Sequence, residues 1–364
     1  MVANVKQYKS DTRQSMPDAS KMPPRFASAN ALQDYLLEGV SRTFALTIPQ
    51  LPAGLREPVS NAYLLCRIVD TIEDEPALSA QLKRDFCHQF VEVVAGKSDP
   101  EGFAHALAPH LSGTTIPAEH ELIQLTPYVI RITRSFNAQQ REALEICISI
   151  MAEGMAEFQQ IGGKADGLAD LPQMDRYCYF VAGVVGEMLT RLFCAYSPEI
   201  AQHQEKMMEL AVSFGQGLQM TNILKDIWDD QQRDACWLPQ DIFTNTGFDL
   251  KNLTPGDYHD SFGQGLGQLI GVAHQHLHDA LEYTLLLPKH EKGMRNFCLW
   301  ALGMAVLTLR KLNKHRDFAN GNEVKITRRS VKATVFASRI SASSDVMLKI
   351  LFTLASVGLP TAPK

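Results

Sequence analysis

The chain has 364 residues, of which 45% are hydrophobic and 21% charged, and its formal net charge is -5. This composition excludes a largely disordered chain, which needs fewer apolar residues, and an electrostatic nucleic-acid binder, which needs a basic surface. The seven cysteines are odd in number and show no CxxC spacing, which predicts reduced thiols in a cytoplasmic protein.

The first 28 residues are polar and lack the apolar run of a signal peptide, so a disordered tail is expected there. No linker divides residues 29–358, which predicts one catalytic domain. No segment reaches the roughly 20 apolar residues that span a bilayer, so no transmembrane anchor is expected. Residues 350–359 are too short to span but could rest on a membrane surface. The sequence does not fix the oligomeric state, and a monomer is the simplest expectation.

Helical periodicity dominates the chain and strand signals are nearly absent, which predicts an all-α fold. Helices are expected, in chain order, over residues 29–40, 55–75, 79–95, 121–136, 141–160, 175–193, 216–230, 258–287, 295–314, 330–340 and 345–356.

Residues 41–52 read SRTFALTIPQLP and allow two interpretations. Ser41 and Thr43 could cap the helix that follows them. Alternatively, these hydroxyls and Arg42 could meet a phosphate, because a helix start offers free N–H groups and a positive dipole end. The residues alone leave both interpretations open.

The helix before Pro76 carries an unusual polar face, in the stretch NAYLLCRIVDTIEDEP. That face consists of Tyr63, Arg67, Asp70 and Asp74. Pro76 should end the helix, which places the acidic residues in its last turn, at the negative end of the macrodipole. Each charge there costs about 0.3–1 kcal/mol unless something compensates it. This pattern indicates a site.

A second helix repeats the pattern in the stretch QGLQMTNILKDIWDDQQRDACWLP, residues 216–239. Its polar stripe consists of Gln216, Gln219, Asn222, Asp226 and Asp230. A helix that is apolar around most of its girth is buried, and buried carboxylates are paired or coordinate a metal. Two such helices predict a facing pair that offers oxygen ligands to Mg²⁺, an ion that keeps several waters and also uses substrate phosphates.

Two further pairs of residues remain ambiguous at this level. Glu153 and Glu157 are either the exposed edge of a core helix or a support for the site. Gly183 and Gly186 each cost about 1 kcal/mol inside a helix. They indicate either close helix packing or room for a bound hydrocarbon.

Six segments together resemble the squalene and phytoene synthase family: SRTFALTIPQL, YLLCRIVDTIEDE, GMAEF, YCYFVAGVVGEMLTRLF, TNILKDIWDDQQ and RNFCLWALGMAVLTL. They run in the family's order from about residue 41 to about residue 325. The resemblance implies the all-α isoprenoid synthase fold, with a central cavity between two acidic motifs, and the head-to-head joining of two prenyl diphosphates.

The resemblance also implies roles for individual residues. The Mg²⁺ ligands would be Asp70, Glu73, Asp74, Asn222, Asp226 and Asp230. The residues that bind the substrate and its diphosphate would be Ser41, Arg42, Tyr63, Arg67, Gln219, Arg191 and Lys225. Of these, Lys225 stands where the family usually has Arg, which keeps the charge but loses the bidentate fork. Tyr177 would steer a proton loss, Arg67 would act at the reacting centre, and Phe44 and Phe297 would flank the carbocations.

Three features favour the branch of the family that reduces its product to squalene: DDQQ, RNFC and EVKITRRS. The last of these would place Lys325 and Arg328 at a phosphate of NADPH, although Thr327 stands where the family commonly has a basic residue. The expected substrates are therefore two farnesyl diphosphates, with Mg²⁺ and NADPH as cofactors. Two alternatives stay open: a dehydrosqualene or phytoene synthase without hydride transfer, and a non-catalytic protein that binds prenyl diphosphates.

Overall fold

A computed structural model describes residue 23 and residues 25–161 and 166–362 of the chain. Most of the expected tail, residues 1–22 and 24, lies outside the described residues, and so do residues 162–165. Within the described part no strand is present beyond one isolated bridge, between Leu168 and Pro239, so the all-α prediction is confirmed. The elements are α1 (Ala29–Val40), α2 (Arg42–Thr47), η1 (Ile48–Gln50), α3 (Ala53–Asp74), α4 (Ala80–Val94), α5 (Pro100–Leu107), η2 (Ala108–His110), α6 (Pro117–Gln124), α7 (Thr126–Ser135), α8 (Ala138–Ile161), α9 (Leu171–Cys178), η3 (Tyr179–Gly183), α10 (Val184–Tyr196), α11 (Pro198–Ala201), α12 (Gln204–Gln231), α13 (Gln240–Asn245), η4 (Leu250–Asn252), α14 (Asp260–Leu286), α15 (Lys292–Lys314), α16 (Gly321–Val324), α17 (Arg328–Ser341) and α18 (Asp345–Ala355).

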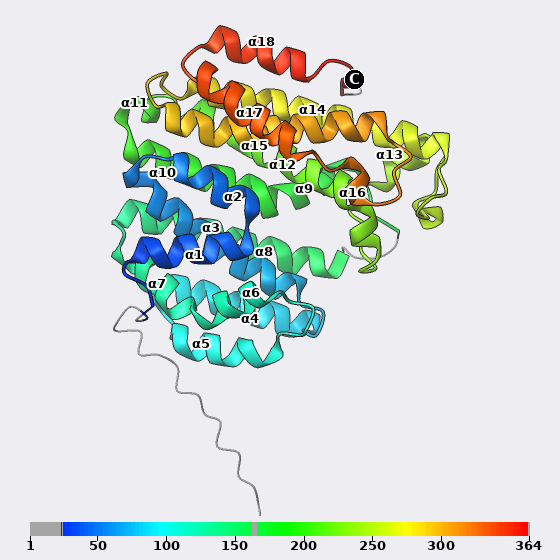
Figure 1. Cartoon of the computed structure of the whole chain (residues 1–364). Helices are drawn as coiled ribbons and strands as arrows, with labels where there is room; N and C mark the ends of the chain where they lie inside the picture. The colour runs from blue at the N-terminus through cyan, green and yellow to red at the C-terminus, as the bar shows by residue number, and fades with distance from the viewer. Residues whose placement is uncertain (1–22, 24, 162–165, 363–364) are drawn as a thin grey trace, which may run out of the picture.

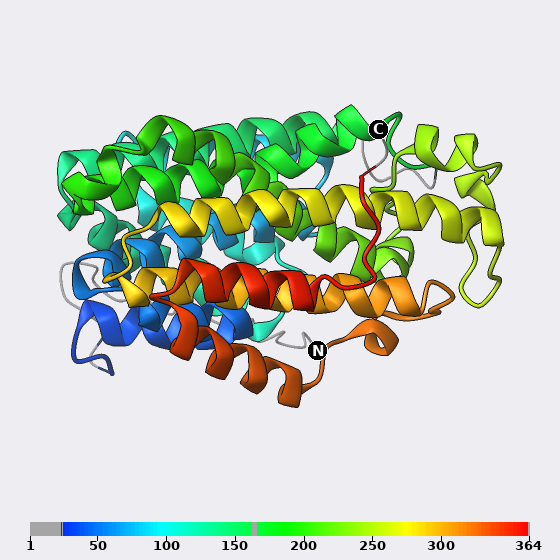
Figure 2. The same cartoon turned by 90° about the horizontal axis from the view of Figure 1, so that it is seen from above.

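The second acidic helix, α12, lies at the centre of the molecule (Figures 1 and 2). It packs against α14 and α15 on one side and against α9, η3 and α10 on the other. Beyond α15 the chain adds α17 and then α18, whereas beyond α10 come α8, α3 and α4. Buried apolar side chains form two clusters, and Val181 and Phe214 contact both. Helix α12 thus has protein on nearly all sides, as its apolar girth predicts.

The first acidic helix, α3, ends at Asp74, and the next residue, Glu75, fixes this end to a distant loop. Glu75 is 1% exposed. Its carboxylate accepts hydrogen bonds from the N–H groups of Ala77 and Ser112 and from the hydroxyl of Thr115, at 2.9, 2.8 and 2.6 Å. Burial alone would raise its pKa, but these donors outweigh burial and lower the pKa of Glu75 to about 2.

Glu75→Gln is expected to lower the free energy of unfolding by about 2–3 kcal/mol at neutral pH, since hydrogen bonds to a buried charge are strong. Because the folded-state pKa is depressed, this contribution is present above about pH 4.5 and is lost as the pH falls toward about 2. Urea unfolding at neutral and acidic pH measures it. The exposed Glu92→Gln, whose partner is Lys97 at 3.5 Å, is the control and should change stability by less than about 0.5 kcal/mol. A Glu75→Gln effect equal at both pH values would contradict the prediction.

The apolar helix expected over residues 175–193 is longer and is interrupted by a π-helical turn, η3. By length and composition alone, Leu171–Tyr196 could cross a membrane, although no segment of that kind was expected from the sequence. It is the one such segment in the part of the chain that the structure describes. In the fold it packs between α8 and α12 and lines a cavity, so its apolar side chains have a place inside the protein.

Close approach of α10 and α12 explains why glycine stands at position 186. A Cβ atom on Gly186 would lie 2.2 Å from the carbonyl oxygen of Ala211, and one on Gly215 would lie 2.3 Å from that of Ala182. Such contacts do not occur between real atoms, so close helix packing is the reason for the glycine. Gly186 also lines the cavity, whereas Gly183 is buried against Tyr179.

One of the expected helices was wrong. The helix expected over residues 121–136 is divided at Leu125 into α6 and α7, because Pro127 is tolerated only in the first turn of a helix. His274, on α14, is half-buried. Its Nδ1 lies 3.1 Å from the carbonyl oxygen of Pro360, in the tail after α18.

Candidate functional site

A cavity of about 900 Å³ lies between α3, α10, α12 and α15. Along α3 its lining changes from Val59 to Asp70, and along α12 from Phe214 to Asp226, so each helix supplies apolar side chains first and polar ones near its C-terminal end. The facing wall from η3 and α10 is apolar, with Val181, Val185, Met188 and Leu189. The cavity can therefore hold a molecule with a long apolar part and a strongly polar head.

The acidic ends of α3 and α12 lie close enough to affect each other. Burial and the charge of Asp74 together raise the pKa of Asp70 to about 7, against the opposing charge of Arg67. Burial and the charges of Asp74 and Asp70 raise the pKa of Glu73 to about 8. On the opposite helix, burial raises the pKa of Asp230 to about 7, with further contributions from Asp226 and, across the gap, Asp74. Negative groups that are desolvated together in this way are compensated when a cation binds.

Hard oxygen donors are the ligands that Mg²⁺ prefers, so the donor set fits this ion. Among the described residues, no three His, Cys, Asp or Glu side chains form a cluster tight enough to hold an ion by themselves. Mg²⁺ keeps several waters and takes substrate phosphate oxygens into its shell, so it needs only a few protein ligands. Of the predicted ligands, Asp70, Asn222 and Asp226 line the cavity, whereas Glu73, Asp74 and Asp230 do not.

Arg67 is held at the polar end of the cavity by three groups. Its Nη2 donates to the hydroxyl of Tyr63 at 2.9 Å, and its Nη1 lies 3.9 Å from Asp70 and 3.6 Å from Glu119. The Tyr63 ring in turn lies 4.9 Å from that of Phe44, which also lines the cavity. The fold thus brings together Arg67 and Tyr63 of the first acidic motif and Phe44 of the SRTFALTIPQL segment.

Lys225 lies on the opposite wall, beside the second acidic motif. Its Nζ is 3.0 Å from Asp226 and donates to Oδ1 of Asn222 at 3.5 Å. Gln219 and Phe297 also line the cavity. So do Lys325 and Arg328, the two residues expected to meet a nucleotide phosphate. Cations from α12 and from the C-terminal part of the chain therefore reach the same space.

Tyr177 is buried and does not line the cavity. Its ring stacks on Trp237, with centroids 4.0 Å apart and planes 5° from parallel. Burial raises the pKa of Tyr177 well above its usual value, and the charges of Glu73, Asp74 and Asp230 raise it further. The phenol is therefore protonated at neutral pH and lies near carboxylates of both acidic motifs.

Three other residues were predicted to bind the diphosphates, and neither of the two whose side chains the structure describes lines the cavity. Ser41 accepts a hydrogen bond from the N–H of Phe44 at 3.1 Å and so caps α2, which is the first of its two interpretations. Arg191 does not line the cavity and affects instead the pKa of Tyr179. Arg42 is the first residue of α2, but its side chain lies outside what the structure describes. Glu157 pairs with Arg176 at 2.8 Å, and Glu153 is exposed.

Sequence reasoning missed several residues of the site. Asp229 lines the cavity, and its spacing of three residues from Asp226 was the available signal. Glu119, which pairs with Arg67, comes from α6 and carried no signal. Gly321, at the start of α16, lies against the second motif: a Cβ atom there would lie 3.2 Å from the carbonyl oxygen of Lys225 and 3.6 Å from Asp229.

The raised pKa values predict how stability depends on pH and Mg²⁺. Between about pH 4 and about pH 8 the folded, metal-free protein binds more protons at Asp70, Glu73 and Asp230 than the unfolded chain does, so its stability falls as the pH rises. Metal binding needs the deprotonated forms. The rise in Tm caused by Mg²⁺ with inorganic diphosphate should therefore be larger at about pH 8 than at about pH 6. Thermal unfolding against a chelator control measures this, and equal rises would contradict it.

Comparison with known proteins gives this site a context. A family model described as squalene/phytoene synthase matches residues 37–330. Squalene synthases of Schizosaccharomyces pombe, Saccharomyces cerevisiae and Rattus norvegicus are 28%, 29% and 29% identical to this chain over 86%, 84% and 78% of its length. The chain spans 66%, 66% and 64% of those relatives, slightly less than two thirds of their length.

Solved structures show the same fold. TcSQS in complex with a ligand aligns with a TM-score of 0.71 at 23% identity, covering 92% of this chain and 93% of that chain. A dehydrosqualene synthase in complex with a ligand aligns with a TM-score of 0.62 at 20% identity, covering 87% and 97%. Because the family model covers well over half of the sequence, the chain belongs to the squalene/phytoene synthase family.

Proposed function

We propose that this protein is a squalene synthase, which joins two farnesyl diphosphates head to head into presqualene diphosphate and then reduces that intermediate to squalene with NADPH. The observation that carries the proposal is the cavity, which is apolar along most of its length and ends between two facing acidic motifs. Its volume of about 900 Å³ lies at the upper end of the range for ligand sites, as two fifteen-carbon chains require. Squalene synthases are also its curated relatives.

The polar end would bind the diphosphates and assist their departure. Asp70, Asn222 and Asp226, which line the cavity, would hold Mg²⁺, and Glu73, Asp74 and Asp230 of the same two motifs would bind it directly or through water. When bound, this ion supplies positive charge to the leaving diphosphate. Arg67 and Lys225 would add cationic donors from the two opposite walls, and both interact with acidic residues that keep them in place.

The apolar end would protect the carbocation that remains after diphosphate leaves. Walls without polar groups exclude water, and the aromatic faces of Phe44 and Phe297 attract positive charge. Each buried CH₂ of the prenyl chain adds about 0.8 kcal/mol to binding. Tyr177 does not line the cavity, so its part in the proton loss would be indirect: its phenol, which feels the charges of carboxylates from both motifs, would position those carboxylates.

The reductive step would use Lys325 and Arg328, which reach the cavity and could meet a phosphate of NADPH. In this proposal residues 29–358 act as one catalytic domain in the cytoplasm, and the protein works as a monomer. A dehydrosqualene or phytoene synthase would need the same acidic motifs but not these cations. A protein that only bound prenyl diphosphates would gain nothing from desolvated carboxylates on both helices.

The test is to incubate purified protein with farnesyl diphosphate and Mg²⁺, with and without NADPH, and to identify the hydrocarbon by mass spectrometry. Squalene that forms only with NADPH is the expected result. Dehydrosqualene in both reactions would place the protein in the non-reductive branch. Tight binding of farnesyl diphosphate without release of diphosphate would support the binding protein instead.

A further inference from the structure

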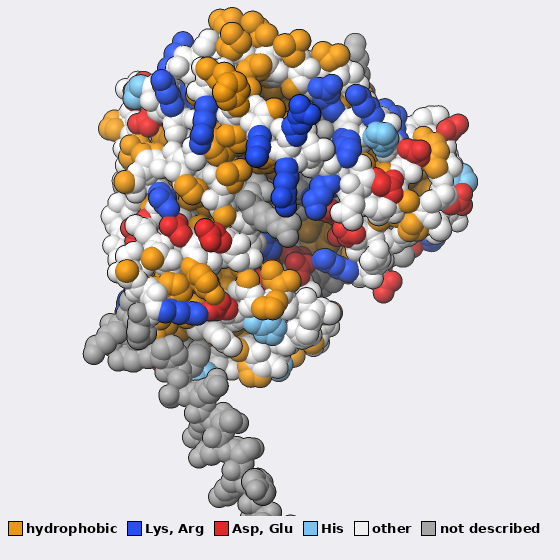
Figure 3. All heavy atoms as spheres, in the orientation of Figure 1, with side chains coloured by type: hydrophobic (Ala, Val, Ile, Leu, Met, Phe, Trp, Pro, Cys, Tyr) orange, Lys and Arg blue, Asp and Glu red, His pale blue; other side chains and the backbone are white. Residues whose placement is uncertain are grey.

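The two C-terminal helices leave a large apolar surface uncovered. This surface, here called the apolar crest, consists of six side chains from α17, from α18 and from just after α18: Phe336, Ile340, Val346, Ile350, Leu354 and Val357. They are 47–70% exposed, which is more than any other large hydrophobic side chain in the described residues apart from Met347, their neighbour. Figure 3 shows apolar side chains gathered over α18 at the top of the molecule. Contiguous apolar surface of this kind marks an interaction site.

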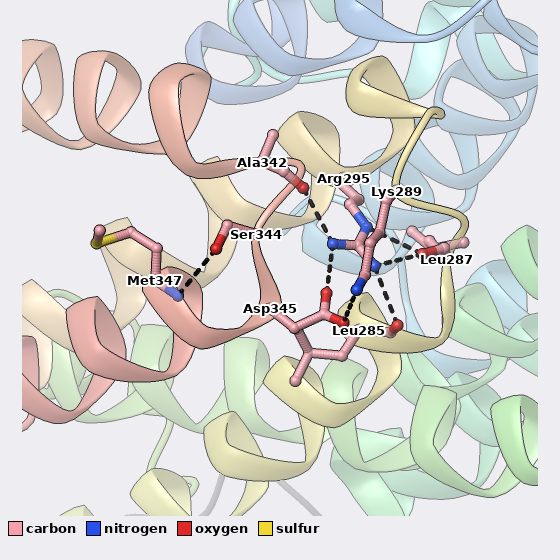
Figure 4. A network of polar contacts seen from close by, with 8 residues as sticks. All are labelled: Leu285, Leu287, Lys289, Arg295, Ala342, Ser344, Asp345 and Met347. Atoms are coloured by element: carbon pink, nitrogen blue, oxygen red, sulfur yellow. Dashed lines mark hydrogen bonds and ion pairs between the residues drawn. The ribbon is translucent and has the colours of Figure 1, made fainter.

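The apolar crest is ordered and is not the outer side of a loose tail. Arg295, which is 1% exposed, donates to the carbonyl oxygen of Ala342 at 3.0 Å and to Asp345 at 2.8 Å, which fixes the turn between α17 and α18 (Figure 4). The inner face of α18 buries Leu348 and packs Phe352 against His274. These helices have already used their inner faces, so the crest is what remains after folding.

The charge around the apolar crest is strongly one-sided. Residues 325–362 contain six basic side chains and one acidic one, a net charge of 6 - 1 = +5, in a chain whose net charge is -5. All six are exposed. Lys325 and Arg328 line the cavity, and the other four are here called the basic belt: Arg329, Lys332, Arg339 and Lys349. The one acidic residue, Asp345, is already paired with Arg295 and with Lys289 at 2.8 and 3.0 Å. In Figure 3, Lys and Arg side chains lie between the apolar top and the rest of the face.

We propose that the apolar crest and the basic belt dock the protein on an anionic lipid bilayer. An apolar ridge enters the boundary between head groups and acyl chains, and basic residues beside it pair with anionic head groups. A protein partner with an apolar groove would not require the one-sided charge. The docking itself does not depend on the proposed reaction.

Helix α17 connects the apolar crest to the cavity. Helix α17 contributes Arg328 and Val331 to the cavity lining and Phe336 and Ile340 to the crest. One helix therefore forms both a wall of the cavity and the surface that meets lipid. A water-insoluble product, such as the hydrocarbon proposed above, would have a short path from the cavity into the bilayer.

The test is co-sedimentation of the full chain with vesicles of phosphatidylcholine, alone or mixed with phosphatidylglycerol. Wild type is expected to bind the mixed vesicles. Ile350→Ser with Leu354→Ser should weaken this binding about tenfold for each residue, through lost apolar burial. Arg329→Gln with Lys332→Gln should weaken it about fivefold for each charge, on the mixed vesicles and at low salt only. None of these four residues lines the cavity.

The matched control is Ile116→Ser, which removes a side chain of similar exposure, 46%, at the start of α6. It should bind vesicles like wild type. Diphosphate release in solution should be the same for the Ile350→Ser, Leu354→Ser variant and wild type, which separates docking from catalysis. Failure of wild type to bind any vesicle would overturn the proposal. Unchanged vesicle binding in both variants would overturn it too. So would the finding that wild type forms a dimer, that the serine variant is a monomer, and that vesicle binding is the same in both.

Discussion

Asp226→Asn is expected to lower the rate of diphosphate release from farnesyl diphosphate by roughly a thousandfold, which corresponds to about 4 kcal/mol of transition-state stabilisation. Asp226 lines the cavity at the end where both acidic motifs meet, and its carboxylate lies 3.0 Å from Lys225. The amide removes a negative charge and one strong ligand for Mg²⁺ but keeps the size of the side chain. The substitution should therefore lower kcat.

The fold should survive this change, because the Asp226 side chain is 35% exposed and its loss leaves no buried partner without a hydrogen bond. We expect a Tm within a few degrees of wild type, as for most partly exposed substitutions. A higher Mg²⁺ concentration should restore part of the activity if the carboxylate acts through the metal, so rates are measured across a Mg²⁺ titration.

The matched control is Asp257→Asn, which makes the same chemical change at an exposed residue beside His259, away from the cavity. Its activity and Mg²⁺ dependence should equal those of wild type. Full activity of Asp226→Asn at every Mg²⁺ concentration would remove Asp226 from the metal site. A large fall in Tm would instead show that the residue acts through the fold.

The sequence was sufficient to predict the helices and the two acidic faces because both are local, periodic signals. Polar residues at steps of three and four on an otherwise apolar helix can be recognised without knowledge of the fold, as on α3 and α12. The facing of these helices followed from chemistry, since only a shared cation compensates both sets of carboxylates. The electrostatic effect of Asp74 on Asp230 agrees with that arrangement.

Contacts between distant segments carried no such signal. Glu119 is an ordinary acidic residue in the first turn of α6, and only the fold brings it within 3.6 Å of Arg67. Trp237 stands in a loop, yet it stacks on Tyr177. The two interpretations of Ser41 could not be separated either, because they depend on whether its hydroxyl faces the N–H of Phe44 or the cavity.

Arg295 is another residue whose structural importance only the fold reveals, although it opens the RNFC segment. Its guanidinium donates to the carbonyl oxygens of Leu285, Leu287 and Ala342 as well as to Asp345 (Figure 4). It thereby joins the end of α14, the start of α15 and the turn before α18. The pKa of Asp345 is lowered, because the hydrogen bonds and charges of Arg295 and Lys289 outweigh the effect of its partial burial.

Arg295→Met is expected to lower the free energy of unfolding by about 3–5 kcal/mol, because it leaves several buried acceptors without donors. The Tm should fall by roughly 5–10 °C. Arg295→Lys should lie between this variant and wild type, since an ammonium cannot serve the spread of acceptors that the planar guanidinium reaches. The matched control is Lys289→Met, which removes the exposed partner of Asp345 and should cost less than about 1 kcal/mol.

The helices that Arg295→Met destabilises show whether Arg295 attaches α17 and α18 or stabilises the core in general. Amide hydrogen exchange should become faster in α17 and α18 of Arg295→Met, under conditions where α3 and α12 remain protected, because the turn at Ala342 loses its attachment to α15. Since α17 supplies Arg328 and Val331 to the cavity, a loosened α17 should also raise KM for farnesyl diphosphate. Exchange that rises uniformly along the chain would show that Arg295 stabilises the whole core and not this attachment.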